Sequence, residues 1–146
     1  MAVEHILQVK KLRATAILPC YAHDDDAGMD LFAAETLAIS PGEVRIVATG
    51  IAVQLPAGTE GQIRPRSGLA LRHGVTVLNS PGTVDAGYRG ELGVILVNHG
   101  VQSVCIEAGS RIAQLVISPI LRVRVTEAAE LSASERATRG FGSTGS

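Results

Sequence analysis

The sequence has no tryptophan, and only two tyrosines and two phenylalanines among its 146 residues. A hydrophobic core must therefore be built from valine, isoleucine, leucine and alanine, and the length favours a single domain. Acidic and basic residues nearly balance, giving a formal net charge of −1. Because nucleic-acid binding relies on an excess of positive charge, we expect no nucleic-acid partner.

Long apolar runs are absent as well. No stretch approaches the roughly 18 consecutive apolar residues that a membrane-spanning helix needs. The first residues include Glu4 and lack the apolar segment of a secretory signal. We therefore expect a cytoplasmic protein without a membrane partner.

Cysteine is scarce, and its placement excludes several classes of site. Cys20 and Cys105 lie far apart and match no metal-binding or redox spacing. One disulfide is an alternative, but we expect two buried thiols. The scattered histidines show no zinc-ligand spacing, and no GxxxxGK[ST] sequence predicts a P-loop.

Short apolar segments separated by turn sequences predict an all-β protein, either a sandwich or a barrel. Strands are expected at 43–48 and 51–55, and the alternating "LRVRV" predicts another at 121–125. The one helical segment is "SGLALRHG", with Ser67 as its cap and Gly74 as its stop. The apolar pattern fades afterwards, so we divide the chain into a β domain, 1–126, and a flexible C-terminal tail, 127–146.

The strand expected at 92–97 is apolar on both faces. Antiparallel strands usually expose one face to water. This strand therefore predicts a second packing layer, which is either another sheet or another subunit.

The stretch "IRPRSGLA" carries the first candidate site. Arg64 and Arg66 are two residues apart and would share a strand face, while Ser67 and Gly68 open the predicted helix. Helix-initial amides beside a hydroxyl and a guanidinium suit a phosphate group. The alternative is an ordinary serine cap beside a solvated arginine.

The stretch "VLNSPGTVDAGYRGELGVILVN" predicts a glycine-rich hairpin that another molecule can approach closely. Main-chain groups there can hold a flat base, and Asn79 adds an amide. Asp85, the only carboxylate inside the loop, is a candidate general base. The alternative is a glycine turn whose aspartate merely favours turns.

Two further polar residues stand beside apolar strands. Asp30 follows Gly28 at the start of "MDLFAA" and can orient water bound to Mg²⁺, whereas Asp24, Asp25 and Asp26 predict a solvated loop. In "RIAQLVI", Gln114 is expected on one face with Ile112 and Val116, where it binds a ligand or cross-links backbone.

Five stretches together resemble the trimeric dUTP pyrophosphatase (dUTPase) family: "AGMDLFA", "RPRSGLA", "NSPGTVDAGYRGEL", "RIAQLVI" and "RGFGSTG". They occur in order between residues 27 and 145. The resemblance implies a jelly-roll-like fold and a homotrimer whose active sites each use all three chains. It also implies hydrolysis of dUTP to dUMP and pyrophosphate with Mg²⁺, which limits uracil in DNA and supplies dUMP for thymidylate synthesis.

The resemblance further implies roles for individual residues. Asp85 would activate water for attack on the α-phosphorus, and Asp30 would contact Mg²⁺ through water, the metal being held mainly by the triphosphate. Uracil would be read by Asn79 and by the backbone near Thr83, Val84 and Gly93, with Tyr88 packed on the deoxyribose. The phosphates would be held by Arg66, Ser67, Gly68 and Gln114.

The resemblance also gives the C-terminal tail a role, because it implies a lid over the bound nucleotide. Phe141 would stack on uracil, Arg139 would pair with the γ-phosphate, and Gly142 and Ser143 would wrap the phosphate chain.

Two alternatives to a dUTPase remain open. Relatives that deaminate dCTP share the fold but use a glutamate where this chain has Ile95, and isoleucine cannot transfer a proton. A non-catalytic jelly-roll module would need neither Asp85 nor the tail.

Overall fold

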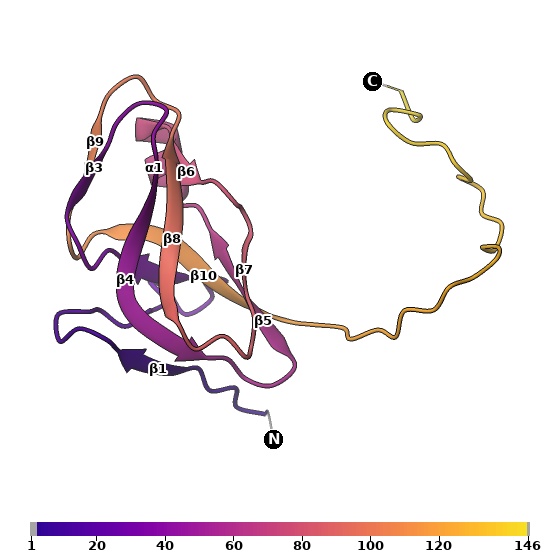
Figure 1. Ribbon diagram of the computed structural model, residues 1–146, viewed down its shortest axis with the longest axis horizontal. Coiled ribbons are helices and arrows are strands. Elements are labelled where there is room, and N and C mark those ends of the chain that lie inside the picture. The colour runs from indigo at the N-terminus through magenta and orange to yellow at the C-terminus, as the bar shows by residue number, and fades with distance from the viewer. Residues whose placement is uncertain (1–2, 146) are drawn as a thin grey trace.

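The computed structural model describes residues 3–145, and Met1, Ala2 and Ser146 lie outside this range. The described residues form an all-β protein with one short helix, as predicted (Figure 1). The elements are β1 (Gln8–Lys11), β2 (Met29–Phe32), β3 (Leu37–Ile39), β4 (Val44–Gln54), β5 (Thr59–Arg64), α1 (Ser67–His73), β6 (Val75–Val77), β7 (Gly82–Val84), β8 (Glu91–Asn98), β9 (Val104–Ile106) and β10 (Arg111–Pro119).

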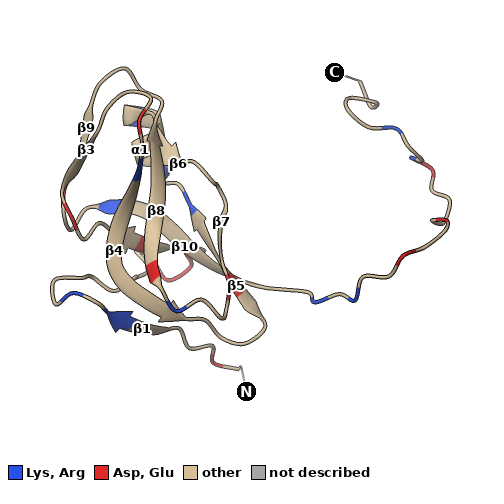
Figure 2. Ribbon diagram, in the orientation of Figure 1, with Lys and Arg blue, Asp and Glu red and all other residues tan. Residues whose placement is uncertain are grey.

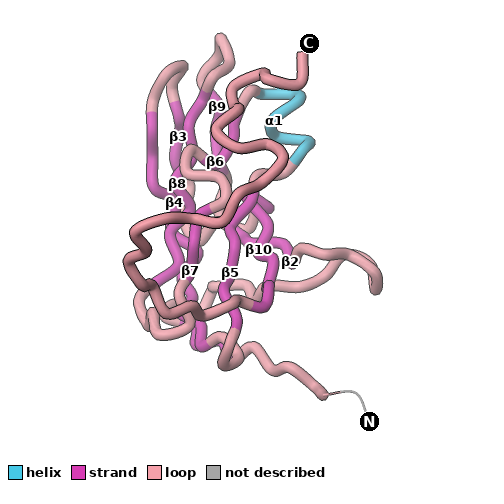
Figure 3. Tube along the Cα trace, turned by 90° about the vertical axis from the view of Figure 1, so that its right-hand side faces the viewer, coloured by secondary structure: helices cyan, strands magenta, loops and turns pink. Residues whose placement is uncertain are grey.

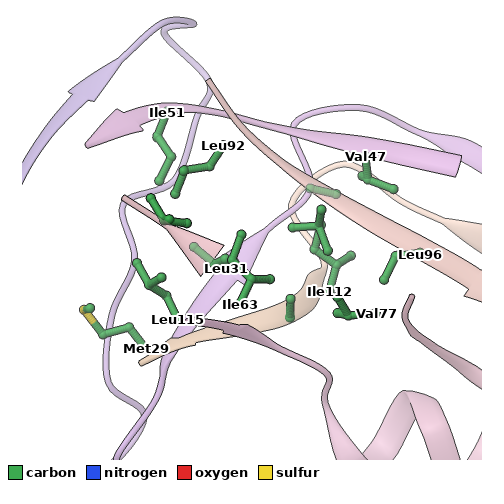
Figure 4. Close-up of a cluster of buried hydrophobic side chains, with 14 of the residues drawn as sticks. Met29, Leu31, Val47, Ile51, Ile63, Val77, Leu92, Leu96, Ile112 and Leu115 are labelled. Atoms are coloured by element: carbon green, nitrogen blue, oxygen red, sulfur yellow. The ribbon is translucent and has the colours of Figure 1, made fainter. Parts of the chain in front are cut away.

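Two four-stranded sheets pack against each other as a sandwich. Sheet A has the order β1-β4-β8-β6 and sheet B the order β2-β10-β5-β7, while β3 and β9 form a separate pair. All the pairings are antiparallel. The buried side chains gather between the sheets and are almost entirely aliphatic (Figure 4). Helix α1 lies at one end of the sandwich beside β6 (Figure 3).

The segments 43–48 and 51–55, predicted as separate strands, form one long strand, β4. Its pairing with β8 shifts between Ala48 and Ala52. Gly50 adopts a positive φ of 71° there, so the chain bulges instead of turning back. The Thr49 hydroxyl, buried by the bulge, donates to the Leu92 carbonyl (2.6 Å).

Strand β8 is apolar on both faces, as predicted. Leu92, Val94 and Leu96 point into the core and are at most 2% exposed. On the other side, Ile95 pairs with Ile46 of β4, which is 64% exposed. We call Val44, Ile46 and Ile95 the outer face of sheet A. No residue of the described chain covers Ile46, although its side chain is large and apolar.

The prediction of a strand at 121–125 is wrong, because these residues have no partner strand within the described chain and are not assigned to a strand. Leu121 and Val125 are 88% and 89% exposed. From residue 120 to 145 the chain runs away from the sandwich as an exposed arm (Figure 1).

The expectation of buried thiols is also wrong: Cys20 and Cys105 are free and exposed. Cys105 lies on the outward side of β9, between the partly buried Val104 and the buried Ile106. Basic and acidic residues are interspersed over both sheets and the arm (Figure 2). Among residues 3–145, no helix has the length and apolar character needed to cross a membrane.

Candidate active site

A buried carboxylate lies between two arginines at one edge of sheet B. Asp30, on β2, is 8% exposed. The Nε of Arg111 donates to its Oδ2 at 2.9 Å, and the Nε of Arg66 lies 3.6 Å from its Oδ1. Two guanidinium groups therefore face one carboxylate, which leaves an excess of positive charge beside it.

Asp30 and Arg66 line a cavity of about 280 Å³. Its wall also contains Ser67, Gly68 and Gln114, so the structure brings together three of the sequence stretches singled out above. These residues come from β2, the start of α1 and β10. The combination of helix-initial amides, a hydroxyl and a guanidinium can receive a phosphate group.

The local geometry differs from the prediction at the start of α1. Arg66 is the N-cap residue, and no side chain caps the first turn, so Ser67 does not act as the cap. Strand β5 ends at Arg64, whose guanidinium binds Gln62 Oε1 at 2.6 Å. Pro65 follows, and Arg66 lies just outside the strand, with its Nε 3.6 Å from Oδ1 of Asp30. Arg64 pairs with Gln114, which pairs with Asp30, so Arg64 lies on the same face of sheet B as that carboxylate. The stop at Gly74 is confirmed by its left-handed φ of 68°.

Gln114 lies at the centre of the cavity wall. Its Nε2 donates to the Pro65 carbonyl at 2.9 Å, which ties β10 to the turn before α1. A Cβ at Gly28 would collide with Oε1 of Gln114, so glycine leaves room for this amide. The cross-link to backbone is therefore present, and it fixes Gln114 at the cavity.

The prediction that Gln114 shares a strand face with Ile112 is wrong, because a β-bulge interrupts β10 after Arg111. Arg111 pairs with Phe32 and Ala113 pairs with Leu31, so Ile112 is the extra residue. Ile112 is 1% exposed and belongs to the core, whereas Gln114 is half-buried. The sequence signal for this bulge is the pair of apolar residues before Gln114, which breaks the strand alternation. Reasoning from the sequence missed Arg111 for the same reason.

The residues expected to read the base and sugar lie outside this cavity. Strands β7 and β8 do not pair with each other: β7 pairs with β5, and β8 with β4 and β6. The predicted hairpin is therefore a connection between the two sheets. Thr83 and Val84 belong to β7, Gly93 belongs to β8, and the Asn79 amide packs against Gly82.

The turn between β7 and β8 is tied by its own polar groups. The Tyr88 amide donates to the Asp85 carbonyl (3.0 Å), and Nη1 of Arg89 donates to the Ala86 carbonyl (2.7 Å). The Tyr88 hydroxyl donates to the Glu91 carbonyl at 3.1 Å. Asp85 is exposed at the start of this turn, directly after β7, so its carboxylate is accessible to a molecule that approaches from outside.

The arm carries the remaining predicted residues, and it contacts neither the cavity nor the turn in the described chain. Arg139 donates only to nearby carbonyls of the arm, those of Glu135 and Arg136. The Phe141 side chain is fully exposed. Gly142 and Ser143 follow it in the same exposed coil (Figure 1).

The residues present at the cavity suit a divalent metal that is bound mainly by a phosphate ligand. No group of three or more His, Cys, Asp or Glu side chains gathers among residues 3–145. Asp30 supplies one hard carboxylate, whose Oδ2 is already bound by Arg111. Mg²⁺ commonly uses one or two carboxylates together with substrate phosphates and water. The donor set therefore fits a metal that arrives with a phosphate ligand.

Fold and cavity together define a class: an all-β sandwich that presents a phosphate-receiving cavity at a sheet edge and a separate, carboxylate-bearing turn. The chain belongs to the dUTPase family, whose model matches residues 14–145.

Named relatives match over nearly the whole chain. A deoxyuridine 5'-triphosphate nucleotidohydrolase of Clostridium tetani is 58% identical over 142 residues, 97% of this chain and 98% of the relative. The protein of the same name from Gloeothece citriformis is 60% identical over 139 residues, 95% of this chain and 96% of the relative.

Solved structures that superpose on this chain are dUTPases as well. The dUTPase of Staphylococcus bacteriophage 80alpha with dUpNHpp superposes with a TM-score of 0.91 at 35% identity, covering 97% of this chain and 99% of that one. A dUTPase from phage phi11 of S. aureus, which coordinates a structural Mg(II) ion, has a TM-score of 0.82 at 29% identity, with 88% and 99% covered.

Proposed function

We propose that this protein hydrolyses dUTP to dUMP and pyrophosphate in the cytoplasm. The observation that carries the proposal is the cavity of about 280 Å³, which Arg66, the start of α1 and Gln114 line together. Membership of the dUTPase family supports the same reaction, since the relatives that share most of this sequence are named for it.

The cavity accounts for binding of the triphosphate. Arg66 supplies a guanidinium, Ser67 and Gly68 supply a hydroxyl and helix-initial amides, and Gln114 supplies an amide held in place by Pro65. Phosphoryl transfer depends on positioning and charge neutralisation more than on covalent chemistry by the protein. These groups are donors, so they match the oxygens of a phosphate chain.

The turn and the strands beside it account for selection of deoxyuridine. The backbone at Thr83, Val84 and Gly93, together with the Asn79 amide, reads uracil, and Tyr88 packs on the deoxyribose. A slot formed by backbone excludes thymine sterically and cytosine by mismatched donors and acceptors. Gly90 leaves room for the Tyr88 ring, because a Cβ there would collide with it.

Asp85 performs the chemical step as a general base. It takes a proton from water as the water oxygen forms a bond to the α-phosphorus. The bond between the α-phosphorus and the bridging oxygen breaks, and pyrophosphate leaves. Asp30 would hold Mg²⁺ through water, and a metal bound with the triphosphate would neutralise charge on the phosphate oxygens.

The protein assembles as a homotrimer with shared active sites. The outer face of sheet A leaves Val44 and Ile46 48% and 64% exposed, which is a poor surface for an isolated chain but a suitable one for an interface. The phosphate cavity and the Asp85 turn are separate in the single chain. A second chain that covers the outer face can bring its own turn to the cavity.

Replacing Ile46 by lysine is expected to dissociate the trimer and abolish dUTP hydrolysis. The substitution would place a charge against the apolar residues of a neighbouring chain, and a buried unpaired charge is strongly unfavourable. Sedimentation velocity at micromolar protein measures the outcome. Val101→Lys is the matched control, because Val101 is 92% exposed and lies off the outer face. An active Ile46→Lys monomer would contradict the shared site.

Tyr88→Ala is expected to raise kcat/KM for UTP relative to dUTP by about tenfold or more, because the sugar loses its steric filter. Competing steady-state assays with the two nucleotides measure this ratio. Tyr88→Phe keeps the ring and should keep the discrimination. Tyr21, with 51% exposure against 48% for Tyr88, provides the control variant Tyr21→Ala. An unchanged ratio in Tyr88→Ala would remove this role.

The arm closes over a bound nucleotide. Arg139 pairs with the γ-phosphate, Phe141 stacks on uracil, and Gly142 and Ser143 contact the phosphate chain. About 20 residues of flexible coil have an r.m.s. span of about 25 Å, enough to reach a neighbouring subunit. The proposed division into a β domain, 1–126, and an arm, 127–146, keeps every residue assigned to the lid in the arm.

A pyrophosphate-release assay with dUTP and dCTP tests the function directly. We expect release with dUTP and neither release nor deamination with dCTP. The deaminase alternative lacks its glutamate, since Ile95 stands on β8 against Ile46. Ammonia release from dCTP would support the deaminase, and inactivity on both nucleotides would support a non-catalytic module.

A further inference from the structure

Arg111 reaches the cavity side of sheet B only because of the β-bulge at Ile112. Arg111 lies across from Phe32, and Gln114 lies across from Asp30. Phe32 and Asp30 are two residues apart on β2 and share a face, so Arg111 and Gln114 share it too. Without the bulge, residues three apart would point to opposite faces. Bulges that re-aim a side chain are common beside active sites.

Two contacts hold the Arg111 guanidinium at Asp30. Its Nε donates to Oδ2 at 2.9 Å, and its Cζ lies 5.4 Å from the centroid of the Phe32 ring. A cation over the ring together with a directed N–H from Nε suits arginine and not lysine, because the lysine ammonium has no guanidinium plane or Nε donor. The guanidinium is therefore oriented as well as charged.

The two oxygens of Asp30 are held unequally. Oδ2 accepts the hydrogen bond from Arg111, whereas Oδ1 lies 3.6 Å from Nε of Arg66, beyond hydrogen-bonding distance. One oxygen is thus fixed by a hydrogen bond, whereas the other lies beside Arg66, which lines the cavity together with Asp30. Asp30 is the carboxylate that would meet Mg²⁺-bound water, so its orientation decides where that contact falls.

We propose that Arg111 is a positioning residue, which fixes Oδ2 of Asp30 so that Oδ1 faces the Mg²⁺–dUTP complex. This role rests on the proposed function. It concerns Arg111, a residue that has no role in the mechanism proposed above. Arg111 acts through Asp30 and does not itself bind the nucleotide.

A thermodynamic cycle tests the proposal by calorimetric titration of the trimer with dUpNHpp. The variants are Arg111→Met, Arg111→Lys, Asp30→Asn and the double variant Asp30→Asn with Arg111→Met. Loss of one charge-assisted hydrogen bond should raise Kd for dUpNHpp with Mg²⁺ on the order of tenfold in Arg111→Met. Without Mg²⁺, in EDTA, the change should be less than about twofold, and Arg111→Lys should recover only part of the loss.

The double variant separates a positioning role from an independent one. If Arg111 acts through Asp30, adding Arg111→Met to Asp30→Asn should change Kd by less than about twofold. Losses that multiply in the double variant would overturn the proposal, as would equal losses with and without Mg²⁺. The Arg111 side chain is 52% exposed and Arg66 remains beside Asp30, so Arg111→Met should still fold, with a melting temperature lowered only by the loss of the hydrogen bond to the buried Oδ2. If Asp30→Asn does not fold, the proposal is tested by comparing the Kd change of Arg111→Met with Mg²⁺ and in EDTA.

A matched control is Arg45→Met. Arg45 is 44% exposed and pairs with Glu43 at 3.1 Å, so it resembles Arg111 in exposure and pairing but lies away from the cavity. It should leave Kd unchanged. Wild-type hydrolysis of dUTP is measured first: an inactive wild type overturns the proposed function, whereas an active wild type with an unaffected Arg111→Met overturns only the positioning role.

Discussion

Asp85→Asn is expected to lower kcat for dUTP by roughly 10³-fold, within the range that general bases contribute. Asparagine has the same shape as aspartate but cannot take the proton of the attacking water. Asp85 is exposed at the start of the turn, and that turn is held by backbone and Arg89 contacts that the substitution leaves in place. The loss should therefore fall on kcat while dUpNHpp still binds.

Pre-steady-state pyrophosphate release and calorimetric binding of dUpNHpp measure the two effects of Asp85→Asn separately. Asp24→Asn is the control, because Asp24 is exposed in a loop and lies outside the lining of the cavity. It should retain wild-type turnover. Near-normal kcat in Asp85→Asn would remove Asp85 as the base.

Deleting residues 137–146 is expected to lower kcat/KM for dUTP by about 10²-fold or more, as several contacts in the transition state are lost together. Closure of the arm would exclude bulk water and strengthen the electrostatics at the triphosphate. The arm makes only local hydrogen bonds in the described chain, and Phe141 is fully exposed. The trimer and its melting temperature should therefore be almost unchanged.

Point variants identify what the deletion removes. Phe141→Ser keeps the length and looseness of the arm but removes stacking on the base, which is worth about 1–3 kcal/mol. Leu131→Ser is the control, because Leu131 is 89% exposed in the same arm and has no assigned contact. A truncated protein that hydrolyses dUTP at the full-length rate would exclude the lid.

The sequence predicted the elements whose signals are local. Gly74 ends α1 because glycine tolerates a positive φ, and β8 was predicted from side chains that are apolar on both faces. Alternation alone failed at "LRVRV", because a strand also needs a partner, and residues 121–125 have none within the described chain.

The sequence could not predict features that arise from register. The bulges between Ala48 and Ala52 and at Ile112 depend on the pairing of β4 with β8 and of β10 with β2. Contact between distant segments also brings Arg66 beside Asp30, which no local pattern around either residue indicates. The resemblance to dUTPases named the phosphate residues, and the cavity brings Arg66, Ser67, Gly68 and Gln114 together, but the residue that orients Asp30 emerged only in three dimensions.

The phosphate cavity, the Asp85 turn and the arm are separate in one chain. This separation determines whether a defective allele is dominant when normal and defective chains are made together. If the chain forms the proposed trimer, a cell that makes two versions of it will form mixed trimers, and under the proposed mechanism an Asp85→Asn copy removes the base from one site per trimer. A copy that also lacks residues 137–146 removes parts from two different sites, if turn and arm serve different neighbours. Such a double allele is therefore partly dominant, because one defective chain silences sites that its normal partners would otherwise complete.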